Sequence, residues 1–268
     1  MTVYRLVMSA LKKIPNSNHV TEVVCDKFSS YLQVDAKYIS VRGVKMAFIW
    51  AIDYYTHDIV WHMLVPEENS LAYLTLFKRL RSSGYELKGL TCDEHQAILG
   101  TVNLVFPKAS VQICIVHYLR NVRYKLNLKE DEDIFFLKDL KRLLLAESMK
   151  EFSIRGRKMM ERYRGNHQVE ILADVVRKES YLTTHIREGK VPATSNLIEC
   201  YNKHLNARLK KIDGFKSYRN AGLWLNGYVW LKRTSKLQCC KEKFKRLNGY
   251  LPLGLTSRDD LEKIYRIN

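Results

Sequence analysis

The chain has 268 residues, of which 46% are hydrophobic and 27% are charged, as is usual for a globular protein and unlike a disordered chain. Its 45 Lys and Arg residues outnumber its 28 Asp and Glu residues, which gives a formal net charge of +17. Such an excess favours a polyanionic partner, most often nucleic acid. No apolar run approaches the ~20 residues that a membrane-spanning helix needs. We therefore expect a cytoplasmic protein with no membrane partner.

The first half of the chain shows the periodicity of strands and helices in alternation. In chain order, the predicted elements are helices within 1–30, strands at 31–42, 44–53 and 57–65, a helix at 69–83, a strand at 87–92, a helix at 95–105 and a strand at 110–115. This order predicts an α/β fold with a mixed sheet and crossover helices.

The second half lacks the alternation that strands would show. Between 118 and 189 the pattern predicts only helices, at 134–145, 148–163 and 169–177. Helical patterning then resumes over 195–210 and continues from 215 to about 246. We therefore expect an all-helical block, followed by two helices that return to the α/β part.

Three acidic residues lie where a carboxylate is costly unless it is paired. Asp35 is in the middle of the first predicted strand, Asp93 ends the fourth, and Glu199 begins a helix. If the first and fourth strands are neighbours, these acids can converge, and three carboxylates suit Mg²⁺ or Mn²⁺. The alternative for each is a solvated surface acid or a cap. Asp53 is a rival for the first position, although its neighbours favour a turn.

Three segments of the chain carry a family resemblance. They are LQVDAKYISV around Asp35, GLTCDEHQAILGTVNLVFPKASVQICIVHYLRNV around Asp93, and VPATSNLIECYNKHLNARLKKIDGFKS around Glu199. Together they resemble the Mutator-type (MULE-like) transposase superfamily, which includes bacterial and archaeal insertion-sequence transposases. The middle segment is the most specific, because several short motifs recur there in order.

The resemblance implies a ribonuclease H-like mixed-sheet core with an all-helical insertion before the catalytic Glu. It places the catalytic and metal-binding DDE triad at Asp35, Asp93 and Glu199, with two Mg²⁺ (or Mn²⁺) ions as cofactors. The implied activity is metal-dependent nicking and strand transfer at mobile-element ends. The implied partners are the element ends and target DNA, so we expect a nucleoid-associated protein that forms a homodimer or larger assembly when active.

The resemblance also suggests an organisation of the chain. The expected parts are a remnant of an N-terminal DNA-binding region at 1–30, a first part of the core at 31–117, the insertion at 118–190, a last part of the core at 191–238 and a C-terminal tail at 239–268. Such transposases usually carry a DNA-binding region well before the first Asp, whereas 34 residues precede Asp35 here. We therefore expect an N-terminally truncated chain or one part of a split reading frame.

Cys114 and His117 match the family's Cys-x-x-His motif, which implies a role next to the catalytic residues or against DNA. The alternatives are a buried thiol and a polar residue at a strand-to-helix junction, a cysteine nucleophile, or half of a zinc site. Two positions depart from the family pattern. Glu94 and Cys200 replace the glycines that often follow the second Asp and the Glu, and Glu94 could compete for metal or alter the turn.

Basic residues are concentrated after Glu199. Between Glu199 and Arg246 there are 13 Lys and Arg residues against three acids. At this net charge, phosphate contact is favoured over a merely solvated helix face. The residues expected to bind DNA are Arg120, Arg208, Lys210, Lys211, Lys216 and Arg219, with Lys232 and Arg233 in the same cluster. Trp224 and Tyr228 have helical spacing, which favours core packing over base stacking.

The sequence leaves two other functions open. The chain could be a catalytically inactive DNA-binding remnant of a transposase, because its N-terminal part is short. It could also be a two-metal nuclease that uses the same triad without strand transfer. The intact triad favours catalysis over the first alternative.

Overall fold

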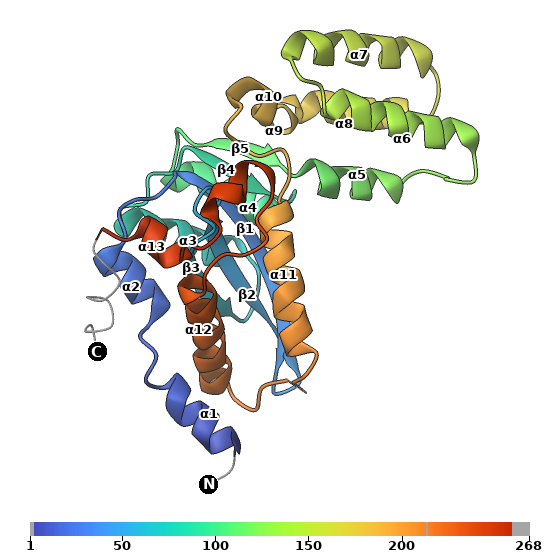
Figure 1. Cartoon of the computed structure of the whole chain (residues 1–268). Coiled ribbons are helices and arrows are strands. Elements are labelled where there is room, and N and C mark those ends of the chain that lie inside the picture. Colours follow the sequence, from blue (N-terminus) through green and yellow to red (C-terminus); the bar gives the residue numbers. More distant parts are fainter. Residues whose placement is uncertain (1–2, 213, 259–268) are drawn as a thin grey trace. The chain divides into compact units, whose positions relative to one another are not determined.

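The computed structural model describes residues 3–212 and 214–258, and the chain divides into two compact units (Figure 1). The first unit combines three segments: Met1–Lys88, Gln96–Ala109 and Asn196–Asn268. The second unit comprises Gly89–His95 and Ser110–Ser195. Both contain strands and helices, so the predicted α/β class is confirmed.

The first unit contains the three consecutive strands that the sequence predicts, β1 (Tyr31–Val41), β2 (Val44–Asp53) and β3 (Ile59–Val65). They pair antiparallel in chain order, with a register shift between Ala51 and Ile52. The turn between β1 and β2 consists of Arg42 at φ 53° and Gly43 at φ 79°. Two positive φ angles are typical of the tight turn that matches the twist of a hairpin, which fixes the register.

Two long helices, α11 (Asn196–Leu209) and α12 (Tyr218–Thr234), pack against one face of these strands. Phe48, Trp50 and Ile52 of β2 alternate along the strand and are completely buried beneath them. Burial of each such side chain contributes roughly 1.5–3 kcal/mol to folding. The core of the first unit is therefore built from segments at opposite ends of the chain.

The remaining elements of the first unit flank this layer. They are α1 (Val3–Leu11), α2 (Ser17–Val24), α3 (Ser70–Ser82), α4 (Gln96–Val105), η1 (Glu242–Leu247) and α13 (Pro252–Thr256). The expected helix from 215 to about 246 is wrong in its second half, because α12 ends at Thr234. Beyond it, Leu237 forms backbone hydrogen bonds with Tyr250 and Gly249, so the chain turns back instead of continuing the helix.

The second unit has two parallel strands, β4 (Gly89–Cys92) and β5 (Ser110–Ile113). Six helices follow: α5 (Ile115–Arg123), α6 (Asp131–Leu144), α7 (Met149–Arg162), α8 (Val169–Arg177), α9 (Glu179–Leu182) and α10 (Thr184–Glu188). The predicted absence of strands between 118 and 189 is thus confirmed for this segment, all of which the structure describes. Among residues 3–212 and 214–258, no helix is both long and apolar enough to cross a bilayer.

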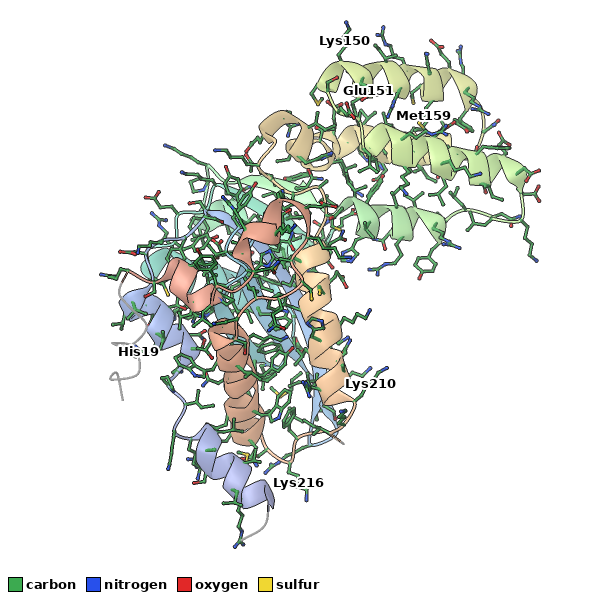
Figure 2. The ribbon with its side chains drawn as sticks, viewed as in Figure 1. His19, Lys150, Glu151, Met159, Lys210 and Lys216 are labelled. Atoms are coloured by element: carbon green, nitrogen blue, oxygen red, sulfur yellow. The ribbon has the colours of Figure 1, made fainter. Side chains whose placement is uncertain are left out.

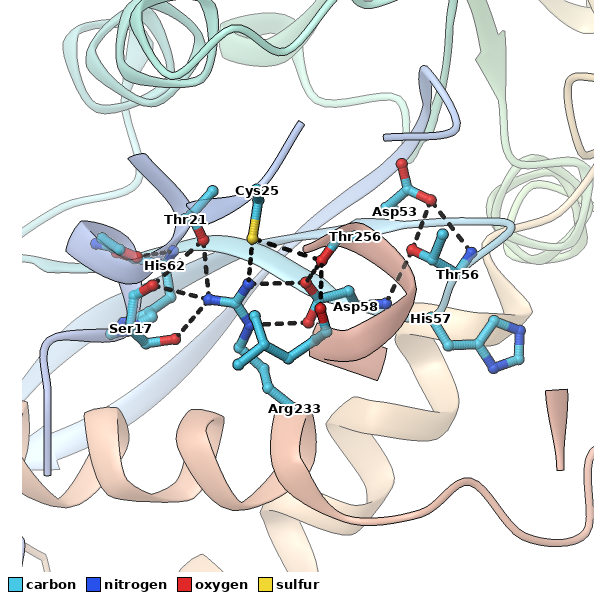
Figure 3. A network of polar contacts seen from close by, with 12 residues as sticks. Ser17, Thr21, Cys25, Asp53, Thr56, His57, Asp58, His62, Arg233 and Thr256 are labelled. Atoms are coloured by element: carbon cyan, nitrogen blue, oxygen red, sulfur yellow. Dashed lines mark hydrogen bonds and ion pairs between the residues drawn. The ribbon is translucent and has the colours of Figure 1, made fainter. Parts of the chain in front are cut away.

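A buried ion pair between Asp58 and Arg233 joins distant parts of the first unit (Figure 3). Arg233 donates to both carboxylate oxygens, at 2.8 Å from Nε and 2.7 Å from Nη2, and neither side chain is exposed. The guanidinium also donates to Thr21, and Thr256 donates to Asp58. The pair therefore links α2, the β2–β3 connection, α12 and α13. The expectation that Arg233 belongs to a DNA-binding cluster is wrong, because it is buried and paired.

Replacing Arg233 with Met should lower the free energy of unfolding by about 3–5 kcal/mol, because Asp58 would remain as a buried charge without its cation. Chemical denaturation of the full chain measures this change. Arg208→Met is the control, since Arg208 is exposed and its loss should cost less than about 0.5 kcal/mol. Similar losses in both variants would contradict a structural role for the pair.

Candidate active site

Helix α11 is held against β1 and the β2–β3 connection by side-chain hydrogen bonds at its first turns. Gln33 of β1 accepts from the backbone amide of Ile198 at 3.1 Å. One turn later, Tyr201 donates to the backbone carbonyl of His57 at 2.8 Å. Glu199 lies between these two anchors, in the first turn, where a negative charge also suits the helix dipole. Its position against β1 is therefore determined by its neighbours.

Asp35 lies two residues after Gln33, so both side chains project from the same face of β1. Its carboxylate accepts from the Asn202 amide at 2.5 Å and from the backbone amide of Ala36 at 2.8 Å. The Asn202 carbonyl oxygen accepts in turn from the buried indole of Trp50 at 3.2 Å. A chain of hydrogen bonds from the core thus orients the Asp35 carboxylate.

Asp35 and Glu199 line one cavity of about 550 Å³ within the first unit. Its other lining residues are Ala36, Lys37, Asn202, Lys203, Asn206, Ala207 and Lys210. The α11 members recur at three- and four-residue intervals and so share one face of the helix. Two carboxylates and three lysines around one cavity suit a site that binds both a cation and a phosphate.

Asp93 directly follows β4 and belongs to the second unit. The end of β4 is fixed by a hydrogen bond from the Cys114 amide to the Cys92 carbonyl at 2.7 Å, and by one from Thr91 to the Pro192 carbonyl, also at 2.7 Å. The structure therefore brings Asp35 and Glu199 together in one cavity. Asp93 follows a strand whose end is fixed by hydrogen bonds. The meeting of all three remains a prediction.

Glu94, the residue after Asp93, forms an ion pair with Lys178. Lys178 also binds Asp174 at 2.7 Å, and Tyr118 donates to the same carboxylate at 3.0 Å. Burial alone would raise the pKa of Asp174, but the hydrogen bonds from Lys178 and Tyr118 hold it below its ordinary value. Glu94 is thus part of a charge network with α5 and the end of α8.

Cys114 is the residue before α5, and its side chain is buried. Its sulfur accepts from the Ser195 amide at 3.3 Å, which connects the start of α5 to the segment that leads into α11. His117 is also buried, one turn later on α5. This placement matches the alternative of a buried thiol at a strand-to-helix junction, and burial argues against a cysteine nucleophile. A role for either residue against DNA remains a prediction.

Asp53 is buried, in agreement with a structural role for this rival acid. Its carboxylate accepts from Ser29, Thr56 and Tyr85, at 2.8 to 3.2 Å. Burial raises the pKa of the Asp53 carboxyl above its ordinary value, although these hydrogen bonds work in the opposite direction. Asp53 therefore stabilises the turn after β2, as the sequence indicates.

The six basic residues expected to bind DNA are all exposed: Arg120, Arg208, Lys210, Lys211, Lys216 and Arg219. Of these, Lys210 lines the cavity of Asp35 and Glu199, and Figure 2 shows it at the end of α11. Arg120 belongs to the second unit. Lys232 lies over the rings of Tyr201 and Tyr228.

The model of the family described as "Transposase, Mutator family" matches residues 17–221 of the chain. The chain belongs to this family of transposases. The match includes Asp35, Asp93 and Glu199, and it confirms the resemblance seen in the sequence. Transposases are a class of enzymes that act on DNA. The search of curated proteins finds no relative that matches.

The donor atoms of the cavity suit a divalent metal ion. Asp35 and Glu199 offer hard carboxylate oxygens, which Mg²⁺ and Mn²⁺ prefer. Within the described ranges 3–212 and 214–258, no group of three or more His, Cys, Asp or Glu side chains is arranged to hold a metal ion. A third ligand from Asp93 stays a prediction from the sequence.

Most residues of the cavity do not appear among the expectations from sequence, and the polar ones nearest in sequence to the two acids are Lys37, Asn202 and Lys203. Lys37 lies two residues after Asp35 on β1, and the other two lie three and four residues after Glu199 on α11. Strand and helix periodicity, counted outward from the two acids, could have found them.

The pairing of Glu94 with Lys178 predicts an energetic coupling between these residues. A double-mutant cycle with Glu94→Gln and Lys178→Met should give a coupling of about 1 kcal/mol in unfolding free energy, because the two charges are in contact and partly buried. Lys129→Met, at an exposed lysine of the same unit, should show no coupling with Glu94→Gln. A coupling near zero for Lys178 as well would mean that Glu94 is free for another role.

Proposed function

We propose that the chain is the catalytic region of a DDE transposase with a ribonuclease H-like core, which nicks DNA at mobile-element ends and joins the ends to target DNA. The observation that carries this proposal is the shared cavity of Asp35 and Glu199, with Asn202 orienting the first carboxylate. The antiparallel order of β1, β2 and β3 is also what such a core needs. Family membership supports the same activity.

In this proposal Asp35, Asp93 and Glu199 would hold two Mg²⁺ or Mn²⁺ ions, which supply activation of the attacking oxygen and charge stabilisation of the leaving oxygen. The nucleophile is water for nicking and a DNA 3′-hydroxyl for strand transfer. In each step a new P–O bond forms and the existing P–O bond to the leaving oxygen breaks.

The other residues of the cavity act by positioning and electrostatics. Lys37, Lys203 and Lys210 surround the two carboxylates and would bind the phosphates that flank the scissile bond. Asn202 keeps the Asp35 carboxylate directed by its hydrogen bond. These contacts place the phosphodiester without taking part in bond making.

Substitution of any one of Asp35, Asp93 or Glu199 by Ala should abolish nicking and leave DNA binding nearly intact, because the basic surface remains. The assay uses labelled terminal-repeat DNA with Mg²⁺ and resolves nicked and joined products. The control is Glu67→Ala, at an exposed carboxylate, which should cut normally. Asp53→Asn is unsuitable as a control, because the buried Asp53 stabilises the fold.

Each outcome of this assay separates the functions that the sequence leaves open. Nicked and joined products from the unmodified chain support a transposase, whereas nicks without joined products indicate a two-metal nuclease. Binding without nicks indicates an inactive remnant. Cleavage at the unmodified rate by any of the three Ala variants would contradict the triad.

Replacing Lys210, Lys211 and Lys216 with Gln should weaken binding about equally for all DNA sequences, because phosphates carry no sequence information. The slope of log K against log salt should become shallower by roughly 0.9 for each phosphate contact that is lost. Fluorescence anisotropy over a salt series measures it. The matched control replaces Lys78, Lys88 and Lys108, three exposed lysines of the same unit that lie outside the cavity and outside the segments expected to bind DNA, and should leave the slope unchanged.

A further inference from the structure

The charges of the second unit are nearly balanced but unevenly distributed. Its segments contain 17 Lys and Arg against 14 Asp and Glu residues, a net charge of only +3. Two cavities between its helices are nevertheless lined by eight of these cations and a single carboxylate. A cluster of cations in a unit that is nearly neutral in total is typical of a site that binds a polyanion.

The first cavity, of about 320 Å³, lies between α5 and α6. Four cations line it together with two leucines: Arg120, Arg123, Lys138 and Lys141, with Leu119 and Leu137. All four cations are exposed, and none forms an ion pair with any residue in the described part of the chain. They are therefore available to an external anion without the loss of an ion pair. Among them, Lys138 lies over the ring of Phe135.

The second cavity, of about 230 Å³, lies between α6 and α7. Its lining residues are Asp139, Arg142, Arg155, Lys158, Met159 and Arg162. The one acid is already engaged, since Asp139 binds Arg162 at 3.0 Å and accepts from the Tyr163 hydroxyl at 3.2 Å. Arg142 also pairs with Asp139, and Arg155 pairs with Glu151 outside the lining, whereas Lys158 forms no ion pair within the described residues. The cavity therefore retains an excess of positive charge.

The exposed face of α6 connects these two cavities. Its buried face carries Phe136, Leu140 and Leu143, which leaves Lys138, Lys141 and Arg142 on the opposite side of the helix. Lys138 and Lys141 line the first cavity and Arg142 lines the second. The eight cations thus form one surface across three helices, called here the α5–α7 surface.

We propose that the α5–α7 surface binds the sugar-phosphate backbone of duplex DNA. Five of its eight cations are arginines, whose planar guanidinium groups bind phosphate oxygens in pairs. The two cavities on either side of α6 would bind phosphates, and the cations on the exposed face of α6 would contact the DNA backbone between those phosphates. This function goes beyond the proposed catalysis, because it assigns the helices of the second unit a contact with DNA that requires neither the triad nor a metal ion.

The test compares two triple variants of the full chain that lose the same charge. One carries Lys138→Gln, Lys141→Gln and Arg142→Gln, in the α5–α7 surface. The other carries Lys150→Gln, Arg157→Gln and Arg164→Gln, three exposed cations of the same unit that line neither cavity. Figure 2 shows Lys150 pointing away from α6 and Met159 lying between α7 and α6. Arg157 lies seven residues after Lys150 and so on the same face of α7, and Arg164 lies beyond the end of that helix.

Binding to a 30-base-pair duplex is measured without divalent metal over a salt series. Each lost phosphate contact should make the slope of log K against log salt shallower by roughly 0.9, so the slope of the first variant should become shallower by about 2.7. The control variant should keep the slope of the unmodified chain. Combination with the Lys210, Lys211 and Lys216 substitutions should give additive losses, because separate phosphates are contacted. Thermal unfolding checks that each variant is folded.

Equal losses in the two triple variants would overturn the proposal, because they would reflect net charge alone, and so would an unchanged slope in the first. A larger loss for single-stranded RNA or for poly-aspartate than for the duplex would assign the surface to another partner. These measurements omit metal, so they can also be made in an Asp93→Ala background. If the cleavage assay contradicts the triad, the result for the α5–α7 surface can therefore still be interpreted by itself.

Discussion

The hydrogen bonds of the Asn202 side chain are the constraint on which the candidate active site depends. An amide has one acceptor end and one donor end, and the buried Trp50 indole requires the acceptor. The donor end must then face Asp35, which it binds at 2.5 Å. Because Trp50 is fully buried in β2, the hydrophobic core itself sets the orientation of a carboxylate at the surface of the strand. Packing and chemistry are coupled here through one side chain.

The acids of the chain show why residue type alone does not identify a site. Asp35, Asp53 and Asp58 all lie in or next to apolar strand sequence. Asp53 is enclosed by hydrogen-bond donors and Asp58 by an arginine, so both stabilise the fold. Asp35 instead lines a cavity that Glu199 shares. The difference lies in the partners, and those come from segments far away in the chain.

Much of the fold follows from the sequence, because alternation and helical spacing report which residues share a face. The strands β1, β2 and β3 and the three long helices α6, α7 and α8 of the second unit are predicted on this basis and confirmed. The pattern does not report what covers each face. The end of α12 at Thr234 depends on pairing of Leu237 with Tyr250, and the burial of Arg233 depends on Asp58. Both contacts join residues that are distant in sequence, and the local periodicity of the sequence cannot predict such contacts.

The discontinuity of the first unit has a consequence during synthesis. Asp35 and its partner Asn202 are 167 residues apart in sequence, and Asp58 and Arg233 are 175 residues apart. At roughly 5–20 residues per second, a ribosome needs roughly 8–35 seconds to bridge such a gap. Throughout this time Phe48 and Trp50 lack the helices that cover them, so the nascent strands need a chaperone or transient contacts to avoid aggregation. The same delay keeps Asp35 apart from Glu199 until the second unit has been made, so the emerging chain cannot assemble their shared cavity before then.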